Sequence, residues 1–223
     1  MSGAGVLLRV ATGAVLVLCG TVWKRCGGFW RRSSWVLKEG VCGVAEKRAP
    51  LPVKLFCGLI RNDEIDAAEV ESVLRTHFGD VEMRFGPHRF DTYTRFYCRE
   101  MGEPLWRHFF AFEGVVDADI LVRAKSVTNE LERRWLRGAR RCVNLDPGYI
   151  HPARLVLASC KDFAHRIYLG GGIYAEVTLL WRRGTWQALE WTFPDFASGA
   201  YFDFFTQLRQ RYLQSLKSRR RCG

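Results

Sequence analysis

Residues 53–79 read VKLFCGLIRNDEIDAAEVESVLRTHFG, and this stretch decides the fold. Its first part, Val53–Ile60, is an apolar run of strand length, which predicts a buried strand. From Asp66 to Phe78 the apolar residues recur at helical spacing, and Gly79 ends the pattern. The folded part of the chain therefore begins with a strand that is followed by an amphipathic helix.

The segments downstream continue this alternation. Two strand-like stretches, Glu82–Phe90 and Trp106–Glu113, come before a second amphipathic helix at Asp119–Trp135. Arg141–Leu145 is a short strand, and the run Asn144–Tyr149 is predicted to end it in a turn, because Asp-Pro-Gly supplies residues that turns favour. The order β-α-β-β-α-β predicts a ferredoxin-like unit.

The rest of the chain predicts an extension of this unit. Ala164–Leu169 and Ile173–Trp181 flank three glycines, which is a strong signal for a β-hairpin. A second turn leads to Trp186–Thr192, and Tyr201–Leu216 has the apolar spacing of a final helix. We therefore assign an α+β fold class, a ferredoxin-like unit extended by a C-terminal β-hairpin region and a final helix.

The positive charge lies at the two ends of the chain. The chain has 223 residues and a formal net charge of +11. Residues 1–48 carry eight basic and two acidic residues, residues 217–223 carry four basic ones and no acid, and residues 49–216 carry 22 basic and 21 acidic ones. A domain that binds nucleic acid usually has its basic excess within the fold. Nucleic-acid binding by residues 49–216 is therefore disfavoured.

The first 48 residues differ from the rest. Their apolar stretch, Val10–Leu18, is shorter than the about 20 residues that a membrane helix needs, and the basic residues after it reverse the charge order of a signal peptide. We expect residues 1–48 to be a disordered or non-native leader, with a membrane anchor as the alternative. Residues 49–216 are then a single α+β domain, and residues 217–223 a basic tail.

The cysteines and short motifs exclude several kinds of site. No Cys-x-x-Cys occurs among the eight cysteines, which argues against a zinc ribbon and a dithiol redox motif. We expect a reducing, cytoplasmic compartment, no disulfides and no metal site. The phosphate-loop pattern Gly-x-x-x-x-Gly-Lys-Ser/Thr is also absent from the sequence.

The predicted hairpin holds the most informative polar residues. If glycines 170–172 form a three-residue loop, Leu169 opposes Ile173, and Arg166 opposes Glu176 on one face. Such a pair is either a cross-strand ion pair of small energy or an Arg fork that receives a phosphate or carboxylate.

The candidate ligand-binding residues surround this pair in sequence. They are Asp146, Tyr149, Lys161, His165, Arg166, Tyr168, Glu176, Trp191 and Asp195. His165 is either a general base near pH 7 or a hydrogen-bonded residue beside a strand. Lys161 is either solvated or points back over Asp146.

Several motifs of the folded part resemble a known family. They read PVKLFCGLI (52–60), EMG (100–102), NLDPGY (144–149), KDFAHRIYL (161–169), GIYAEVTL (172–179) and WTFPDF (191–196). Together they resemble the bacterial domain of unknown function DUF4416 over about residues 50–216. Some members of that family are labelled GTP-binding proteins, and the resemblance implies no reaction and no cofactor. Members often have Tyr at the positions of Phe193 and Phe196, so a shared function does not need hydroxyls there.

Two functions remain open at this stage. We expect a cytoplasmic protein that binds, and in one version acts on, a small anionic ligand such as a nucleotide, GTP included, or a phosphometabolite. The alternative is a non-catalytic interaction or structural protein without a small-molecule site. Nucleic acid and membrane partners are disfavoured, and the sequence specifies no catalytic residue, cofactor or oligomeric state.

Overall fold

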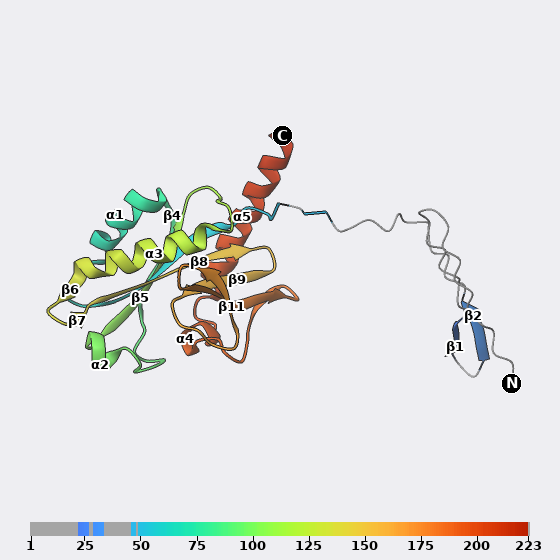
Figure 1. Cartoon of the computed structure of the whole chain (residues 1–223), viewed down its shortest axis with the longest axis horizontal. Helices are drawn as coiled ribbons and strands as arrows, with labels where there is room; N and C mark the ends of the chain where they lie inside the picture. The colour runs from blue at the N-terminus through green and yellow to red at the C-terminus, as the bar shows by residue number, and fades with distance from the viewer. Residues whose placement is uncertain (1–21, 27–28, 34–45, 48, 223) are drawn as a thin grey trace. The chain divides into compact units, whose positions relative to one another are not determined.

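The structure is a computed structural model (Figure 1) and describes residues 22–26, 29–33, 46–47 and 49–222. The chain divides into two units, residues 1–48 and residues 49–223. In the first unit, β1 (Val22–Cys26) and β2 (Phe29–Ser33) pair as antiparallel strands. The sequence predicted no regular structure there, and the pairing of β1 with β2 differs from that. The disordered or non-native leader stays a prediction. The prediction for residues 1–21 and 34–45 lies outside the described residues.

The second unit is a mixed α and β fold built on one large, mostly antiparallel sheet. Its strands are β3 (Lys54–Asn62), β4 (Val81–Arg89), β5 (Leu105–Phe112), β8 (Val143–His151), β9 (Arg154–Ser159), β10 (Arg166–Gly170), β11 (Ile173–Arg182) and β12 (Thr185–Ala188). They lie in the order β10-β11-β9-β8-β3-β5-β4, and β12 pairs with β11. The short strands β6 (Leu136–Arg137) and β7 (Arg140–Arg141) form a separate pair.

The helices occupy the connections between strands. They are α1 (Ala67–Phe78), α2 (Cys98–Met101), α3 (Ile120–Glu132), the single 3₁₀ turn η1 (Arg133–Trp135), α4 (Pro194–Ala197) and α5 (Phe202–Cys222). The two predicted amphipathic helices are present as α1 and as α3 with η1. The final helix is also present, but it continues past Leu216, so most of the predicted basic tail is helical. Within the described residues, no helix is both long and apolar enough to cross a membrane.

The large sheet separates two hydrophobic cores. Successive residues of a strand face opposite sides, so Leu55 and Leu59 of β3 join a mostly aliphatic core with α1 and α3, whereas Phe56 joins an aromatic core with α5. Phe205 of α5 packs against Phe56 with ring centroids 5.1 Å apart. Tyr212 anchors the same helix, since its hydroxyl donates to the Pro52 carbonyl at 2.8 Å.

The turn that the sequence predicted at Asn144–Tyr149 does not form, because β8 passes straight through it. Pro147 has no N–H to donate. Its nitrogen and the backbone groups of Leu145 point away from β3, to the edge of β8 that no strand pairs with at these positions. A Cβ at Gly148 would lie 2.5 Å from the Val156 carbonyl oxygen of β9. Proline and glycine therefore serve the sheet here, one at an open edge and one at a close approach of two strands.

Candidate functional site

The candidate site lies where the sheet splits between β8 and β9. Residues 148–151 of β8 pair with β9, whereas residues 143–147 pair with β3 alone. Leu145 therefore turns its N–H and C=O to an edge without a strand, and buried backbone groups need partners. Helix α3 supplies both: Glu132 Oε1 accepts from the Leu145 N–H at 2.7 Å, and Lys125 Nζ donates to the Leu145 oxygen at 2.8 Å.

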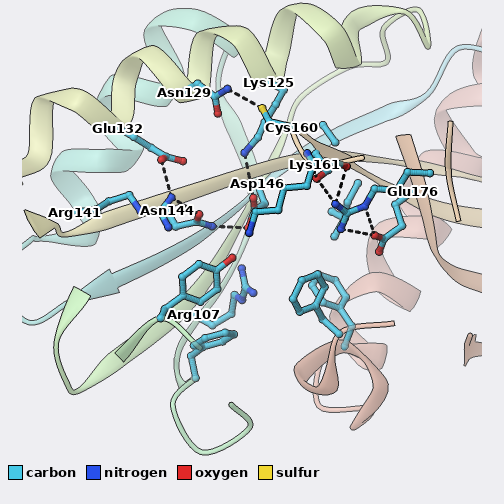
Figure 2. A pocket seen from close by; sticks show the side chains of 18 residues that line it. Arg107, Lys125, Asn129, Glu132, Arg141, Asn144, Asp146, Cys160, Lys161 and Glu176 are labelled. Atoms are coloured by element: carbon cyan, nitrogen blue, oxygen red, sulfur yellow. Dashed lines mark hydrogen bonds and ion pairs between the residues drawn. The ribbon is translucent and has the colours of Figure 1, made fainter. Parts of the chain in front are cut away.

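Helix α3 presents these groups because of their spacing. Lys125, Asn129 and Glu132 lie at positions i, i+4 and i+7, which form one stripe of a helix. Figure 2 shows all three on the side of α3 that faces the split. Lys125 and Glu132 are buried, so the helix places two charged side chains where a regular sheet would have another strand.

A cavity of about 190 Å³ occupies this split. Its lining combines cationic, carboxylate and aromatic side chains. The cations are Arg107, Lys125, Arg141, Lys161 and Arg166, the carboxylates are Glu132, Asp146 and Glu176, and the aromatic rings are Phe90, Tyr97, Phe193 and Phe196. Small-molecule pockets of this kind usually join apolar walls to a few convergent polar groups.

Asp146 lies at the centre of the polar network (Figure 2). Its Oδ1 accepts from Lys125 Nζ at 3.2 Å, and its Oδ2 accepts from Asn144 Nδ2 at 2.5 Å. Arg141 Nη1 donates to Asn144 Oδ1 at 2.9 Å and extends the network. Burial opposes the ionisation of Asp146, but the charges of Lys125 and Arg107 outweigh it and hold the pKa of this carboxyl below its ordinary value. Asp146 is therefore a carboxylate at neutral pH.

The pKa values of the two buried α3 side chains, Glu132 and Lys125, are both raised, for different reasons. Burial raises the pKa of Glu132 above its ordinary value, although Lys125 and the Leu145 N–H act against it. Burial by itself lowers the pKa of Lys125, but the carboxylates of Asp146 and Glu132 outweigh it, and the net pKa is raised. Lys125 is thus an ammonium group at neutral pH. No three His, Cys, Asp or Glu side chains of the described part are grouped to hold a metal ion.

Arg107 of β5 is the most deeply buried cation of the cavity, with its side chain only 5% exposed. Its Nε and Nη2 donate to Asp195 Oδ2 at 3.2 and 2.8 Å, and the Tyr201 hydroxyl donates to the same oxygen. Its Nη1 has no hydrogen-bond partner among the described residues. Gly58 leaves room for that nitrogen, because a Cβ there would lie 3.2 Å away. Leaving a buried donor unpaired is costly, and Nη1 is the nitrogen of this guanidinium for which the described residues supply no acceptor.

The predicted hairpin register is confirmed at its polar end. Arg166 opposes Glu176 and Tyr168 opposes Tyr174. The prediction that Leu169 opposes Ile173 is wrong, because Gly170 takes that place after a bulge. All three loop glycines have positive φ, between 59° and 119°, and this permits the tighter turn.

Most N–H groups of Arg166 already donate to other groups of the protein. Its Nε donates to Glu176 Oε2 at 2.8 Å, and its Nη2 lies 2.8 Å from the same oxygen. Its Nη1 donates to Ser159 Oγ at 2.6 Å and to the Lys161 carbonyl at 3.0 Å. A guanidinium has five N–H groups, so these contacts leave Arg166 with fewer free donors than a ligand fork would need. Arg107 is better placed for that role.

The structure brings together only part of the predicted site. Asp146, Lys161, Arg166 and Glu176 line the cavity. Three other predicted residues do not line the cavity but contact residues that do, directly or through each other: His165, Trp191 and Asp195. The Nε2 atom of His165 is 3.1 Å from Glu176 Oε2, and the His165 ring stacks on Trp191 with ring centroids 5.2 Å apart. Asp195 forms an ion pair with Arg107.

Two predicted residues lie outside the cavity. Tyr149 packs against a hydrophobic cluster that contains Leu121 and Val156. It is an odd number of positions from Asp146 on β8 and so faces the opposite side of the sheet. Tyr168 is 60% exposed near the hairpin tip, where its ring contacts Tyr174.

Several residues of the site were not predicted from the sequence. They are Arg107, Lys125, Asn129, Glu132 and Arg141. Three of them had a signal: Arg107 interrupts an otherwise mostly aromatic strand, and Lys125 and Glu132 recur on the buried side of a helix. Nothing in the sequence marks Arg141, which contacts Glu132 and Glu100 only in the fold.

Comparison with known proteins identifies a family for this chain. The family described as a domain of unknown function (DUF4416) matches residues 51–212. This range includes every residue that lines the cavity. No curated protein and no solved structure matches the chain.

Proposed function

Because this chain belongs to the DUF4416 family, whose description assigns no activity, we propose a function from the geometry of the site. The protein binds a small anionic ligand of the nucleotide or phosphometabolite class in the cavity between β8 and β9. The observation that carries this proposal is the buried guanidinium of Arg107, whose Nη1 lacks a partner among the described residues. Guanidinium donors suit phosphate and carboxylate oxygens in both charge and geometry.

The cations are held in place before any ligand arrives. Asp195 fixes Arg107 from behind, and Glu100 and Glu132 hold Arg141 through its two terminal nitrogens. The Nε of Arg141 has no partner in the described part of the chain. Groups that are already oriented lose little entropy on binding, so this arrangement supports recognition of an anion rather than a purely structural role.

Lys161 adds an exposed cation to the cavity. Its ammonium lies 4.9 Å from the centre of the Phe96 ring, and no hydrogen bond of this ammonium occurs within residues 49–222. A side chain in this position can reach an anion without breaking a hydrogen bond of the fold, since its ammonium contacts the exposed Phe96 ring. It is therefore the residue of choice for a test that leaves stability unchanged.

The alternative function rests on a different surface. Ile167, Tyr168 and Leu169 of β10 are 68%, 60% and 41% exposed, and exposed apolar groups of this kind often contact a partner. An interaction protein would use this strand and keep the polar network as a structural element.

We also propose a ferredoxin-like arrangement for the core of the second unit and a cytoplasmic location. The strand order β8-β3-β5-β4, with α1 and α3 in the two crossovers, supports the topology. The described cysteines Cys57, Cys98, Cys142 and Cys160 are free thiols, which supports a reducing compartment.

A thermal-shift screen of the full chain tests the ligand class. Nucleotides and phosphorylated metabolites, at constant ionic strength, should raise the melting temperature, because a ligand that binds only the native state stabilises it. Lys161→Met should reduce the shift severalfold. The control Arg133→Met removes another exposed cation, one that lies outside the cavity and pairs with Glu130, and it should not change the shift. The proposal is wrong if no compound in the panel stabilises the protein, or if the two variants weaken binding equally.

A further inference from the structure

We infer that the ligand is a phosphate ester of a polyhydroxylated carbon unit, that is, a sugar phosphate whose hydroxyl groups donate to Asp146 while its phosphate meets the cations around it. This inference rests on the proposed function, since it names the ligand class of the same cavity. It starts from an apparent contradiction: a cavity lined by five cations has a carboxylate at its centre.

Asp146 keeps free acceptor capacity that faces the cavity. A carboxylate has about four lone-pair sites, and the structure fills one on each oxygen, from Lys125 and from Asn144. The Asp146 side chain is 26% exposed, whereas that of Lys125 is 8% exposed. The remaining acceptor sites are therefore open to a ligand that carries hydrogen-bond donors.

A simple anion does not suit this centre. A phosphate or carboxylate next to ionised Asp146 would bring two negative charges together in a partly buried site, which is unfavourable. The anionic group of the ligand must therefore lie away from Asp146, toward a cation that no carboxylate of the fold neutralises, such as Lys161, whose ammonium makes no hydrogen bond within residues 49–222. The part of the ligand beside Asp146 must carry donors and no negative charge.

Hydroxyl groups suit Asp146 better than an ammonium group. Lys125 Nζ already lies 3.2 Å from Asp146 Oδ1, and Arg107 adds a second positive charge nearby. A ligand ammonium beside these two would be repelled, whereas a neutral hydroxyl donates a hydrogen bond without that cost. Neighbouring hydroxyls on one carbon chain can use both oxygens of the carboxylate, as a sugar does.

The walls and the size of the cavity narrow the class further. The rings of Phe90, Tyr97, Phe193 and Phe196 offer apolar surface for the carbon face of such a ligand. The volume of about 190 Å³ is below the roughly 300–1,000 Å³ of pockets that enclose drug-sized molecules. A free sugar phosphate therefore fits the cavity better than a whole nucleotide, although a nucleotide contains the same ribose phosphate group.

Isothermal titration of the full chain with four probes tests the inference. The probes are ribose 5-phosphate, pentyl phosphate, inorganic phosphate and GMP. Pentyl phosphate has the carbon count and the phosphate of ribose 5-phosphate but no hydroxyls. Ribose 5-phosphate should bind at least about tenfold more tightly than pentyl phosphate, because hydrogen bonds to a charged acceptor are strong. GMP should bind no more tightly than ribose 5-phosphate.

The variant Asp146→Asn assigns the selectivity to this carboxylate. It keeps the shape of the side chain and removes the charge, so the preference for ribose 5-phosphate over pentyl phosphate should fall to nearly one. Asp203→Asn, an exposed site on α5, should keep the preference. The ratio measured in the unsubstituted protein stands as a test even if Asp146→Asn does not fold.

The outcomes separate this inference from the proposed function. If no probe binds, the proposed function fails and this inference fails with it. If phosphate compounds bind but ribose 5-phosphate and pentyl phosphate bind equally, only the inference fails. Retention of the preference in Asp146→Asn would overturn the role of that carboxylate. Binding of GMP more than about tenfold tighter than ribose 5-phosphate would replace the free sugar phosphate by a nucleotide.

Discussion

The two halves of β8 share one neighbour and differ in the other. Both halves pair with β3, but residues 148–151 also pair with β9, whereas residues 143–147 have α3 beside them. In the paired half the strands approach so closely that position 148 has no room for a Cβ. In the other half, Lys125 and Glu132 complete the backbone hydrogen bonds of Leu145.

This difference shows how the fold produces the site. Where a strand completes the sheet, backbone groups pair with backbone groups and no polar side chain is needed. Where a helix completes it, long charged side chains must reach the edge, and each buried charge then needs a partner of its own. Lys125 therefore forms an ion pair with Asp146, and Glu132 forms one with Arg141. The same contacts that satisfy the sheet edge build the polar lining of the cavity.

The largest loss of unfolding free energy is expected for a substitution in the half of β8 that α3 completes. Lys125→Met leaves the Leu145 oxygen and the Asp146 carboxylate without their cation, and breaking a buried ion pair in this way costs about 3–5 kcal/mol. Urea denaturation measures the loss. As the matched control, Arg84→Met breaks an exposed pair with Glu71 and should cost less than about 1 kcal/mol. Equal losses in the two variants would mean that the sheet edge does not depend on Lys125.

A smaller effect is expected in the half that β9 completes. Gly148→Ala places a Cβ 2.5 Å from the Val156 carbonyl oxygen and 2.8 Å from the Phe56 ring, so backbone must shift. Overpacking of this kind costs about 2–3 kcal/mol.

Gly58→Ala on the neighbouring strand β3 is the control, because its Cβ would meet only side-chain atoms, of Arg107 and Phe109, at 3.2 Å. A loss of about 1 kcal/mol is expected there. The interpretation of Gly148 as a close-approach position is contradicted if its substitution is tolerated better than that of Gly58.

The same comparison explains what could be predicted from the sequence. Periodicity located the strands and the main helices, because it is a local signal. The Arg166–Glu176 pair was predicted from a three-residue loop, whereas the structure has a two-residue turn and reaches the same pair through a bulge. The β8 turn was predicted wrongly, since Pro147 and Gly148 are turn residues unless the strand order is known. Lys125 was not predicted as a site residue, because the open edge of Leu145 that it completes depends on the strand order.

The partner of Arg107 shows the same limit at longer range. Asp195 lies 88 positions away in the chain, and no local pattern joins the two. The fold brings them together because β5 and α4 contact the same aromatic core, in which Phe109 and Phe196 have ring centroids 5.6 Å apart. Sequence patterns thus predict elements well and predict poorly the pairs that only the packing of those elements creates.

The smallest expected effect is on how the free energy of unfolding depends on pH. In the half of β8 that α3 completes, Asp146 and Glu132 should contribute to this dependence with opposite signs. The folded-state pKa of Asp146 is lowered, so its contribution to stability is complete above the unfolded pKa of about 4 and is lost as the pH falls through the folded value. The folded-state pKa of Glu132 is raised, so its contribution is present below the unfolded pKa and is lost as the pH rises through the folded value.

Asp146→Asn should therefore lose less stability, relative to the unsubstituted protein, as the pH falls below about 4. Glu132→Gln should compare more favourably as the pH rises from about 4 to 7. Urea denaturation across this range measures both differences, and slopes of the same sign would contradict the assignment of opposite roles to these two carboxyl groups.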